Sequence, residues 1–122
     1  MTDVGFSDEE LLRRVAGRDP AALASLYDRY APLVYGLARR IVRDDGQAED
    51  LVQEVFLRVW NRPHVYDQGR GSFRAWLLSM THHLAVDLVR RRRREVSYRK
   101  KLTGSTETPD PFEEALNEVD GA

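Results

Sequence analysis

The chain of 122 residues contains no cysteine. Disulfide bridges and thiolate metal sites are therefore excluded, and this composition is typical of a cytoplasmic protein, which is the location we expect. Long apolar runs are missing too. No uninterrupted stretch approaches the roughly 20 residues that span a bilayer, so we expect no membrane insertion. The N-terminus lacks a basic segment followed by an apolar run, so no signal peptide is predicted.

Lysine is scarce: Lys100 and Lys101 stand beside 17 arginines. The formal net charge of −1 hides a strong segregation of charge along the chain. All 19 basic residues lie within residues 1–101, which carry about +5, whereas residues 102–122 hold six acids and no base. A basic body followed by an acidic tail predicts a polyanionic partner for the body.

Histidine is the remaining candidate for metal or acid–base chemistry, and its pattern supports neither. His64, His82 and His83 lack the i, i+4 spacing of a helical metal site. No glycine-rich phosphate loop follows a strand, and no nucleophile–base arrangement is evident. We therefore predict no enzyme activity, no catalytic residues, no metal site and no cofactor.

Hydrophobic periodicity predicts an all-α fold, a compact bundle of four principal helices without a strand. The expected starts carry capping residues, which are Ser7, Asp19 before Pro20, Asp44 or Asp45, and Ser72. The first helix is expected to end at Gly17, the second before a turn at residues 44–46, the third at Asn61 and the fourth at about Thr103. Pro32 falls inside the second helix, where we expect a kink or a break.

The predicted domain spans residues 1–101, and residues 102–122 are expected to form an acidic linker that is largely disordered. Residues 111–119 could form a short amphipathic helix, but one too short to be stable alone. The predicted core residues share the apolar faces of the helices. They are Leu26, Tyr30, Leu37, Leu51, Val55, Phe56, Trp76, Leu77 and Met80.

The third predicted helix has a polar side opposite its apolar stripe. Asp50, Gln53, Glu54 and Arg58 lie on this side. Such a face is often plain solvated surface, but carboxylates and an amide also suit charged hydrogen bonds to a partner helix.

Aromatic and basic residues gather from Arg62 to the start of the fourth helix. Tyr66 lies in a glycine-containing loop, which favours an exposed ring that could stack on a base. Phe73 and Trp76 could equally pack in the core at helical spacing. The five consecutive arginines at 90–94 could form a solvated helix end, but their density favours a phosphate-binding edge.

An acidic, glutamine-bearing helix, a short loop and an aromatic helix ending in arginines occur here in that order. This order resembles region two of bacterial sigma factors, and more narrowly the extracytoplasmic-function group. The resemblance covers about residues 8–94 and implies binding to core RNA polymerase and opening of promoter DNA. It implies that the third helix docks on a coiled coil of the polymerase's largest subunit. The implied polymerase-binding residues are Asp50, Gln53, Glu54, Arg58 and Trp60.

The same resemblance places the non-template strand of the minus-ten element on the loop and the fourth helix. The loop would hold a flipped base, and the helix start would contact its neighbours. The implied DNA-binding residues are Arg62, His64, Tyr66, Asp67, Arg70, Phe73, Arg74, Trp76, His83, Arg90, Arg91, Arg92, Arg93 and Arg94. An anti-sigma factor is implied as a further partner.

Two departures from the family pattern matter. Family members often have Ala-Arg-Asn where this chain has Thr81-His82-His83, so His83 leaves the promoter preference open. The family's second helical domain is not present before Ala122, and we expect the chain to be a fragment cut at the linker. Two other hypotheses remain: a helical protein-interaction module without DNA melting activity, and a nucleic-acid regulator independent of polymerase.

Overall fold

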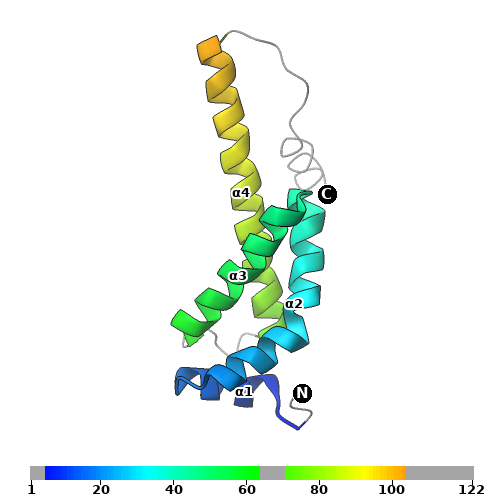
Figure 1. Cartoon of the computed structure of the whole chain (residues 1–122), viewed down its shortest axis with the longest axis vertical. Helices are drawn as coiled ribbons and strands as arrows, with labels where there is room; N and C mark the ends of the chain where they lie inside the picture. Colours follow the sequence, from blue (N-terminus) through cyan, green and yellow to red (C-terminus); the bar gives the residue numbers. More distant parts are fainter. Residues whose placement is uncertain (1–4, 64–70, 104–122) are drawn as a thin grey trace.

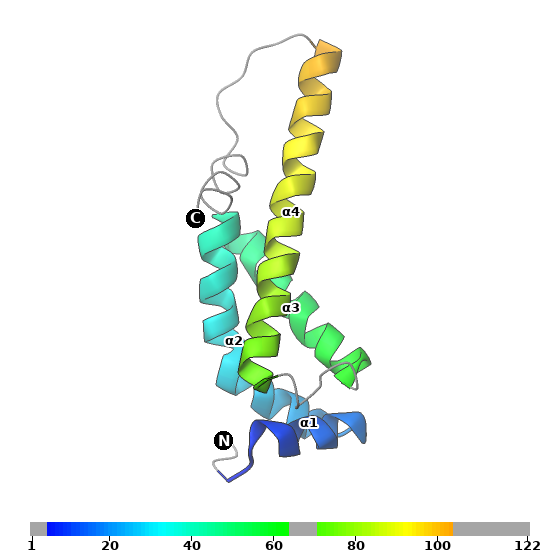
Figure 2. The same cartoon turned by 180° about the vertical axis from the view of Figure 1, so that it is seen from behind.

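Residues 5–63 and 71–103, which the computed structural model describes, form four α-helices (Figure 1). These are α1 (Asp8–Ala16), α2 (Pro20–Val42), α3 (Asp45–Asn61) and α4 (Phe73–Thr103). α2 and α4 run in the same direction, α3 runs in the opposite direction and packs against both, and α1 crosses the end of the bundle where α2 begins (Figures 1 and 2). The prediction of an all-α bundle is confirmed for this part of the chain.

The predicted capping residues begin the helices. Each one accepts a hydrogen bond from a backbone N–H two or three residues later, which satisfies a donor that has no partner within the helix. The four acceptors, at distances between 2.8 and 3.1 Å, are the side chains of Ser7, Asp19, Asp44 and Ser72. Asp44 rather than Asp45 therefore caps α3.

Pro32 bends α2 without breaking it. The helix is continuous from Pro20 to Val42, so a break at this position is ruled out, and its direction changes near the middle (Figures 1 and 2). Pro32 has no N–H to offer the carbonyl of Asp28 one turn earlier. Leu26 and Val34, on either side of the proline, are buried in the same core, and this packing keeps both halves in the bundle.

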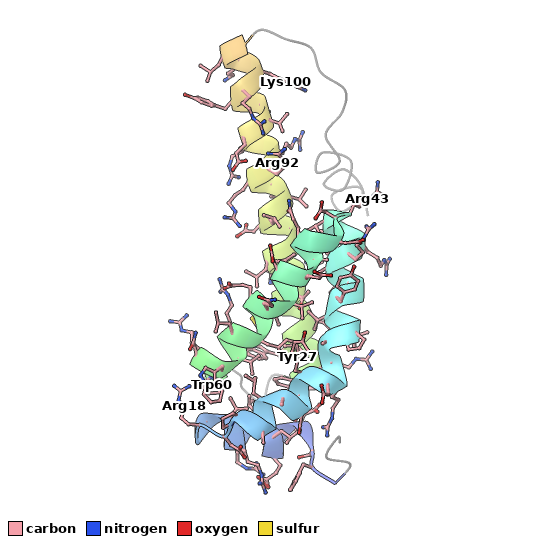
Figure 3. The ribbon with its side chains drawn as sticks, in the orientation of Figure 1. Arg18, Tyr27, Arg43, Trp60, Arg92 and Lys100 are labelled. Atoms are coloured by element: carbon pink, nitrogen blue, oxygen red, sulfur yellow. The ribbon has the colours of Figure 1, made fainter. Side chains whose placement is uncertain are left out.

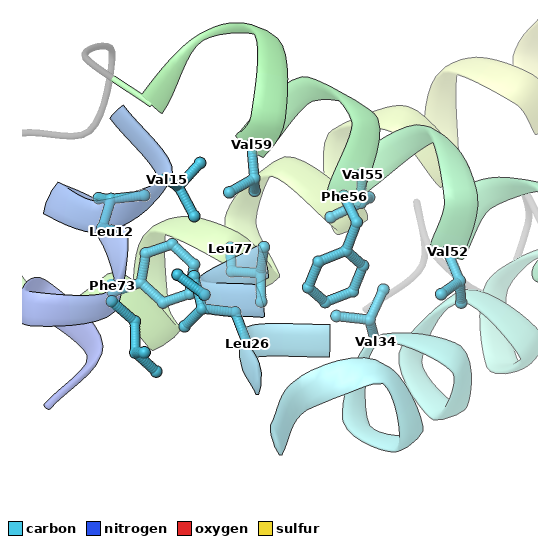
Figure 4. Close-up of a cluster of buried hydrophobic side chains, with 12 residues drawn as sticks. Leu12, Val15, Leu26, Val34, Val52, Val55, Phe56, Val59, Phe73 and Leu77 are labelled. Atoms are coloured by element: carbon cyan, nitrogen blue, oxygen red, sulfur yellow. The ribbon is translucent and has the colours of Figure 1, made fainter. Parts of the chain in front are cut away.

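Two hydrophobic cores hold the helices together. The first core joins all four helices at the α1 end (Figure 4) and contains Leu11, Leu12, Val15, Ala22, Leu26, Val34, Val52, Val55, Phe56, Val59, Phe73 and Leu77. The second core joins α2, α3 and α4 and contains Ala38, Ile41, Val42, Ala48, Leu51, Ala85, Val86 and Val89. Full burial of one such aliphatic or aromatic side chain contributes ~1.5–3 kcal/mol. The first core thus stabilises α1, which is too short to be stable alone.

The predicted core residues divide into two groups. Those that are buried are Leu26, Leu51, Val55, Phe56 and Leu77. Those that are half-buried at the edge of a core are Tyr30, Leu37, Trp76 and Met80. α4 continues past the predicted boundary at residue 101 as far as Thr103, and its last turns extend beyond α2 and α3, where Tyr98 and Leu102 are exposed (Figure 1).

Candidate functional site

The outer side of α3 is exposed because its inner side is fixed in both cores. Leu51, Val55 and Val59 are buried on the inner side. Asp50, Gln53 and Arg58 are exposed, and Glu54 is half-exposed. These side chains are therefore available to a partner, as the helical period predicts.

Leu57 was missed as a member of this outer face. It is 54% exposed and follows Gln53 and Glu54 at i+4 and i+3, so it lies on the same side of the helix. The signal was present in the sequence, since Leu57 falls outside the apolar stripe. We call Asp50, Gln53, Glu54, Leu57 and Arg58 the α3 outer face; its apolar centre is surrounded by polar groups.

The α3 outer face borders two different hollows. Gln53 lines a groove of about 610 Å³ between α2 and α3, together with Tyr27, Asp28 and Tyr35. The side chains of the other polar members line a hollow of about 860 Å³ between α3 and α4; they are Asp50, Glu54 and Arg58. The face therefore forms a ridge with an acidic groove on one side and a mixed-charge hollow on the other.

Within this face, Arg58 pairs with Glu54. Arg58 Nε donates to Glu54 Oε2 at 2.9 Å, one helical turn apart. Both side chains are about half exposed, and a pair of this kind is worth only ~0.3–0.5 kcal/mol. Its main effect is to orient the Glu54 carboxylate, which remains accessible to a partner.

The five arginines at 90–94 do not all point to the same side of α4. Consecutive helical residues are rotated by about 100°, so five of them surround the helix. Arg91 and Arg92 line the hollow opposite Asp50 and Glu54, and Arg92 also approaches Glu95 at 3.6 Å. The structure thus brings predicted DNA-binding arginines close to predicted polymerase-binding acids, which the sequence had separated.

Phe73, which the resemblance implies as a DNA-binding residue, is fully buried at the start of α4. Its ring lies between Tyr30 and Trp76, with both centroids at 5.7 Å. A base cannot stack on this ring unless the first core opens. Trp76 is half-buried against the same core, so part of its ring remains accessible, and Arg74, two residues earlier in α4, is exposed.

The other predicted DNA-binding residues are described only in part. His64, Tyr66, Asp67 and Arg70 lie outside the described residues. Arg62 is exposed immediately after α3. On α4, His83 is exposed, and its ring centroid is 5.9 Å from that of His82. Thr81, in contrast, is buried and donates its hydroxyl to the carbonyl of Leu77 at 2.8 Å, so it belongs to the packing of α4.

Trp60 lies at the edge of the α3 outer face, seven residues after Gln53 and thus on nearly the same side of the helix. It packs against the first core, and the guanidinium of Arg18 lies 5.1 Å from its ring centroid. Arg18 Nη1 also donates to the Trp60 carbonyl at 2.8 Å. Figure 3 shows both side chains at the end of α3 near the α1–α2 turn. Trp60 is therefore part of an internal contact, and only its outer edge could reach a partner.

A polar network that was not predicted joins α1 to α2. Arg29 Nη1 donates to Asp8 Oδ1 at 2.7 Å, and the Tyr30 hydroxyl donates to the other oxygen of Asp8. Burial first, and then the hydrogen bond to Asp8, raises the pKa of Tyr30 to about 12. Since Tyr30 also contacts Phe73, the network connects α1 with the start of α4.

A second network holds the α2–α3 turn. The Arg39 guanidinium donates to Asp45 Oδ1 at 2.5 Å, and the Tyr35 hydroxyl donates to the same oxygen at 3.2 Å. The hydrogen bond from Arg39 lowers the pKa of the Asp45 carboxyl. These contacts fix the beginning of α3 relative to α2.

Within residues 5–63 and 71–103, no three His, Cys, Asp or Glu side chains are grouped as a metal site would require. None of the helices described is both long and apolar enough to cross a membrane.

The sequence is similar to that of known proteins. Residues 26–95 match the family Sigma-70 region 2. Over 82 residues the chain is 50% identical to a protein of Mycobacterium tuberculosis (strain ATCC 25618 / H37Rv) named ECF RNA polymerase sigma factor SigK, covering 67% of this chain and 44% of that relative. A protein of the same name from Mycobacterium sp. (strain KMS) is 40% identical over 109 residues, 89% of this chain and 56% of the relative. The chain spans about half the length of these relatives. It belongs to the sigma-70 region 2 family, as the region-two domain of an extracytoplasmic-function sigma factor.

Proposed function

We propose that this chain directs transcription initiation as the promoter-recognition and promoter-melting domain of an alternative sigma factor. It binds core RNA polymerase through the α3 outer face and the non-template strand of the minus-ten element through α4 and the segment before it. Membership of the family supports this role. The relatives are named RNA polymerase sigma factors, which supports polymerase as the partner.

The observation that carries the polymerase half is the exposure of the α3 outer face. Asp50 and Gln53 project from a helix whose opposite side is buried in two cores, so they can bond a partner without a change of fold. Leu57 adds an exposed apolar contact between them and the end of the helix. A small apolar centre with a polar rim is a usual pattern in protein interfaces. The coiled coil of the largest subunit is the partner element that we propose for it.

The DNA-binding half of the proposal rests on accessible side chains at the start of α4 and along its length. Trp76 presents part of its ring, and Arg74 is exposed two residues earlier in α4; an aromatic ring and a cation are the groups that bind an unstacked base and a phosphate. The arginines at 90–94 surround α4, so only those that point away from α3 can contact DNA directly. We propose Tyr66, from the sequence, as the base-stacking residue of the preceding segment. The proposal places the protein in the cytoplasm, with an anti-sigma factor as its regulator.

Strand binding can be tested without knowing the promoter. A pool of labelled random 12-nucleotide single strands is bound to the 122-residue chain, and sequencing of the bound fraction gives the preferred strand. Fluorescence anisotropy then compares this strand with a scrambled strand and with its own duplex. We expect preference for the single strand, and Tyr66→Ala should reduce discrimination at least about fivefold, the lower end for one base–aromatic stack.

Two results would contradict this half of the proposal. Equal affinity for the preferred strand, its duplex and the scrambled strand would show that the chain does not recognise a single strand. The helical protein-interaction module would then be the better hypothesis. If Tyr66→Ala discriminates normally, the base-stacking group is another residue, and the half-buried Trp76 and the exposed His83 are the alternatives.

A further inference from the structure

Arg18 occupies a backbone conformation that usually belongs to glycine. Its φ is +66°, in the left-handed region, directly after the C-cap Gly17. The N–H of Arg18 donates to the Val15 carbonyl at 2.8 Å, and the N–H of Asp19 donates to the Arg14 carbonyl at 3.0 Å. These two bonds define a Schellman motif, in which a Cβ atom at the left-handed position is unfavourable. Strain of this kind persists where surrounding contacts impose it, and it is frequent at functional positions.

The side chain of Arg18 ties this turn to the far end of α3. It donates to the carbonyl of Trp60 at 2.8 Å, and its guanidinium lies 5.1 Å from the centroid of that indole ring (Figure 3). The last carbonyls of a helix lack partners within the helix, and a cation is favoured at this end. The single side chain of Arg18 therefore caps α3 and covers the aromatic ring of its last turn.

The chain that leaves α3 at this point leads to the proposed DNA-binding surface. Arg62 follows as the C-cap of α3, with its N–H bonded to the Arg58 carbonyl at 2.8 Å. On the other side of the segment, Phe73 begins α4 and packs against Tyr30, which Asp8 holds. The end of α3 and the start of α4 are thus anchored on residues of α1, the α1–α2 turn and the first half of α2.

We infer that Arg18 is a positioning residue for strand binding, which acts by fixing the end of α3 and hence the direction in which the chain leaves it. The inference rests on the proposed DNA-binding function and assigns a role in it to the N-terminal part of the chain. Arg18 contacts Trp60 rather than DNA, so its removal should change discrimination between strands while the charge-dependent part of binding is preserved.

The sequence offers a matched control. Arg43 is the other non-glycine residue with positive φ in the described part of the chain, with φ +56° at the C-cap of α2. Figure 3 shows Arg43 at the opposite end of α2 from Arg18. Arg18→Gly and Arg43→Gly each remove one charge and relieve the same type of strain. Arg18→Lys keeps the charge but loses the planar fork that donates to the carbonyl while stacking on the indole.

The test is anisotropy on the 122-residue chain with the preferred single strand and a scrambled strand at several salt concentrations, together with thermal unfolding. Arg18→Gly and Arg18→Lys should each lose at least about fivefold in discrimination, comparable with the loss of one base stack. The slope of affinity against salt should stay as in the parent for Arg18→Lys. Tm should stay within roughly 5 °C of the parent for Arg18→Gly, because relief of strain offsets the lost contacts. Arg43→Gly should discriminate like the parent.

Each other result overturns the inference. Parent-like discrimination by Arg18→Gly would show that the contact with Trp60 does not position the site. The proposed function would still be supported by the parent's preference for one single strand over the scrambled strand. Parent-like behaviour of Arg18→Lys alone would make Arg18 a simple charge contact with phosphate. A fall in Tm beyond roughly 5 °C in both Arg18 variants, or an equal loss in Arg43→Gly, would show general destabilisation. If the parent itself shows no preference, the proposed function fails as well.

Discussion

Substitution of Phe73 tests whether this residue, which the resemblance implies as DNA-binding, serves the core instead. The ring is fully buried in the first core and contacts the rings of Tyr30 and Trp76 at centroid distances of 5.7 Å. Phe73→Ala removes a large buried side chain and leaves a cavity, so we expect the free energy of unfolding to fall by about 3–5 kcal/mol. The loss of two ring contacts favours the upper part of that range.

Urea denaturation followed by circular dichroism at 222 nm measures this cost directly. Phe73→Leu provides the second variant, because it keeps the site apolar and should cost only about 1–2 kcal/mol, as ordinary core substitutions do. The leucine variant should remain folded and bind the preferred single strand with parental affinity, whereas Trp76→Leu should bind it less well. The reasoning would be refuted if Phe73→Ala cost under about 1 kcal/mol, far below the cavity range, while Phe73→Leu lost strand affinity.

Two further predictions follow from the charge distribution and the α1–α2 network. Replacing Arg91 and Arg92 by Ala should weaken binding of the preferred and scrambled strands about equally. It should also flatten the dependence of the affinity, measured by anisotropy, on salt concentration. An unchanged slope would show that these arginines do not contact phosphates and serve only the hollow beside α3. Burial and the bond to Asp8 raise the pKa of Tyr30 to about 12, so its stabilising contribution is full below pH 10 and is lost as the pH rises from 10 through 12. The free energy of unfolding of the parent should therefore fall more steeply across that window than that of Tyr30→Phe, and parallel curves would contradict the assignment.

The helices and their starts could be predicted from sequence because their determinants are local. Ser7, Asp19 and Ser72 each bond a backbone N–H within three residues, so the sequence alone contains both partners. The same holds for the apolar stripe of α3. The effect of Pro32 was harder to predict from the sequence. Its local cost favours a break in the helix, whereas the packing of Leu26 and Val34 in one core keeps the helix continuous.

The candidate site was less predictable because its features depend on contacts between distant parts of the chain. Helical periodicity does not distinguish a core aromatic from one that binds a ligand, so the sequence left core packing and DNA contact both open for Phe73. The position of Arg91 opposite Asp50 depends on how α4 packs on α3. The contact between Arg18 and Trp60 joins residues 42 positions apart, so no local pattern indicates it. Leu57 is the exception, since its exposure follows from its place outside the apolar stripe of α3.

Binding to core RNA polymerase is the most direct test of the account. The parent chain and a variant carrying both Asp50→Lys and Glu54→Lys are each titrated into core enzyme, with binding followed by the anisotropy of a label at the N-terminus and with thermal unfolding as the control. We expect the parent to bind core enzyme, and the double variant to bind at least about tenfold more weakly, because like charges would then face the cationic groups expected in the partner. Its Tm should be almost unchanged, since both side chains lie on the exposed side of α3. Parental affinity in the double variant would contradict the role of the α3 outer face, and absence of binding by the folded parent would contradict the proposed function itself.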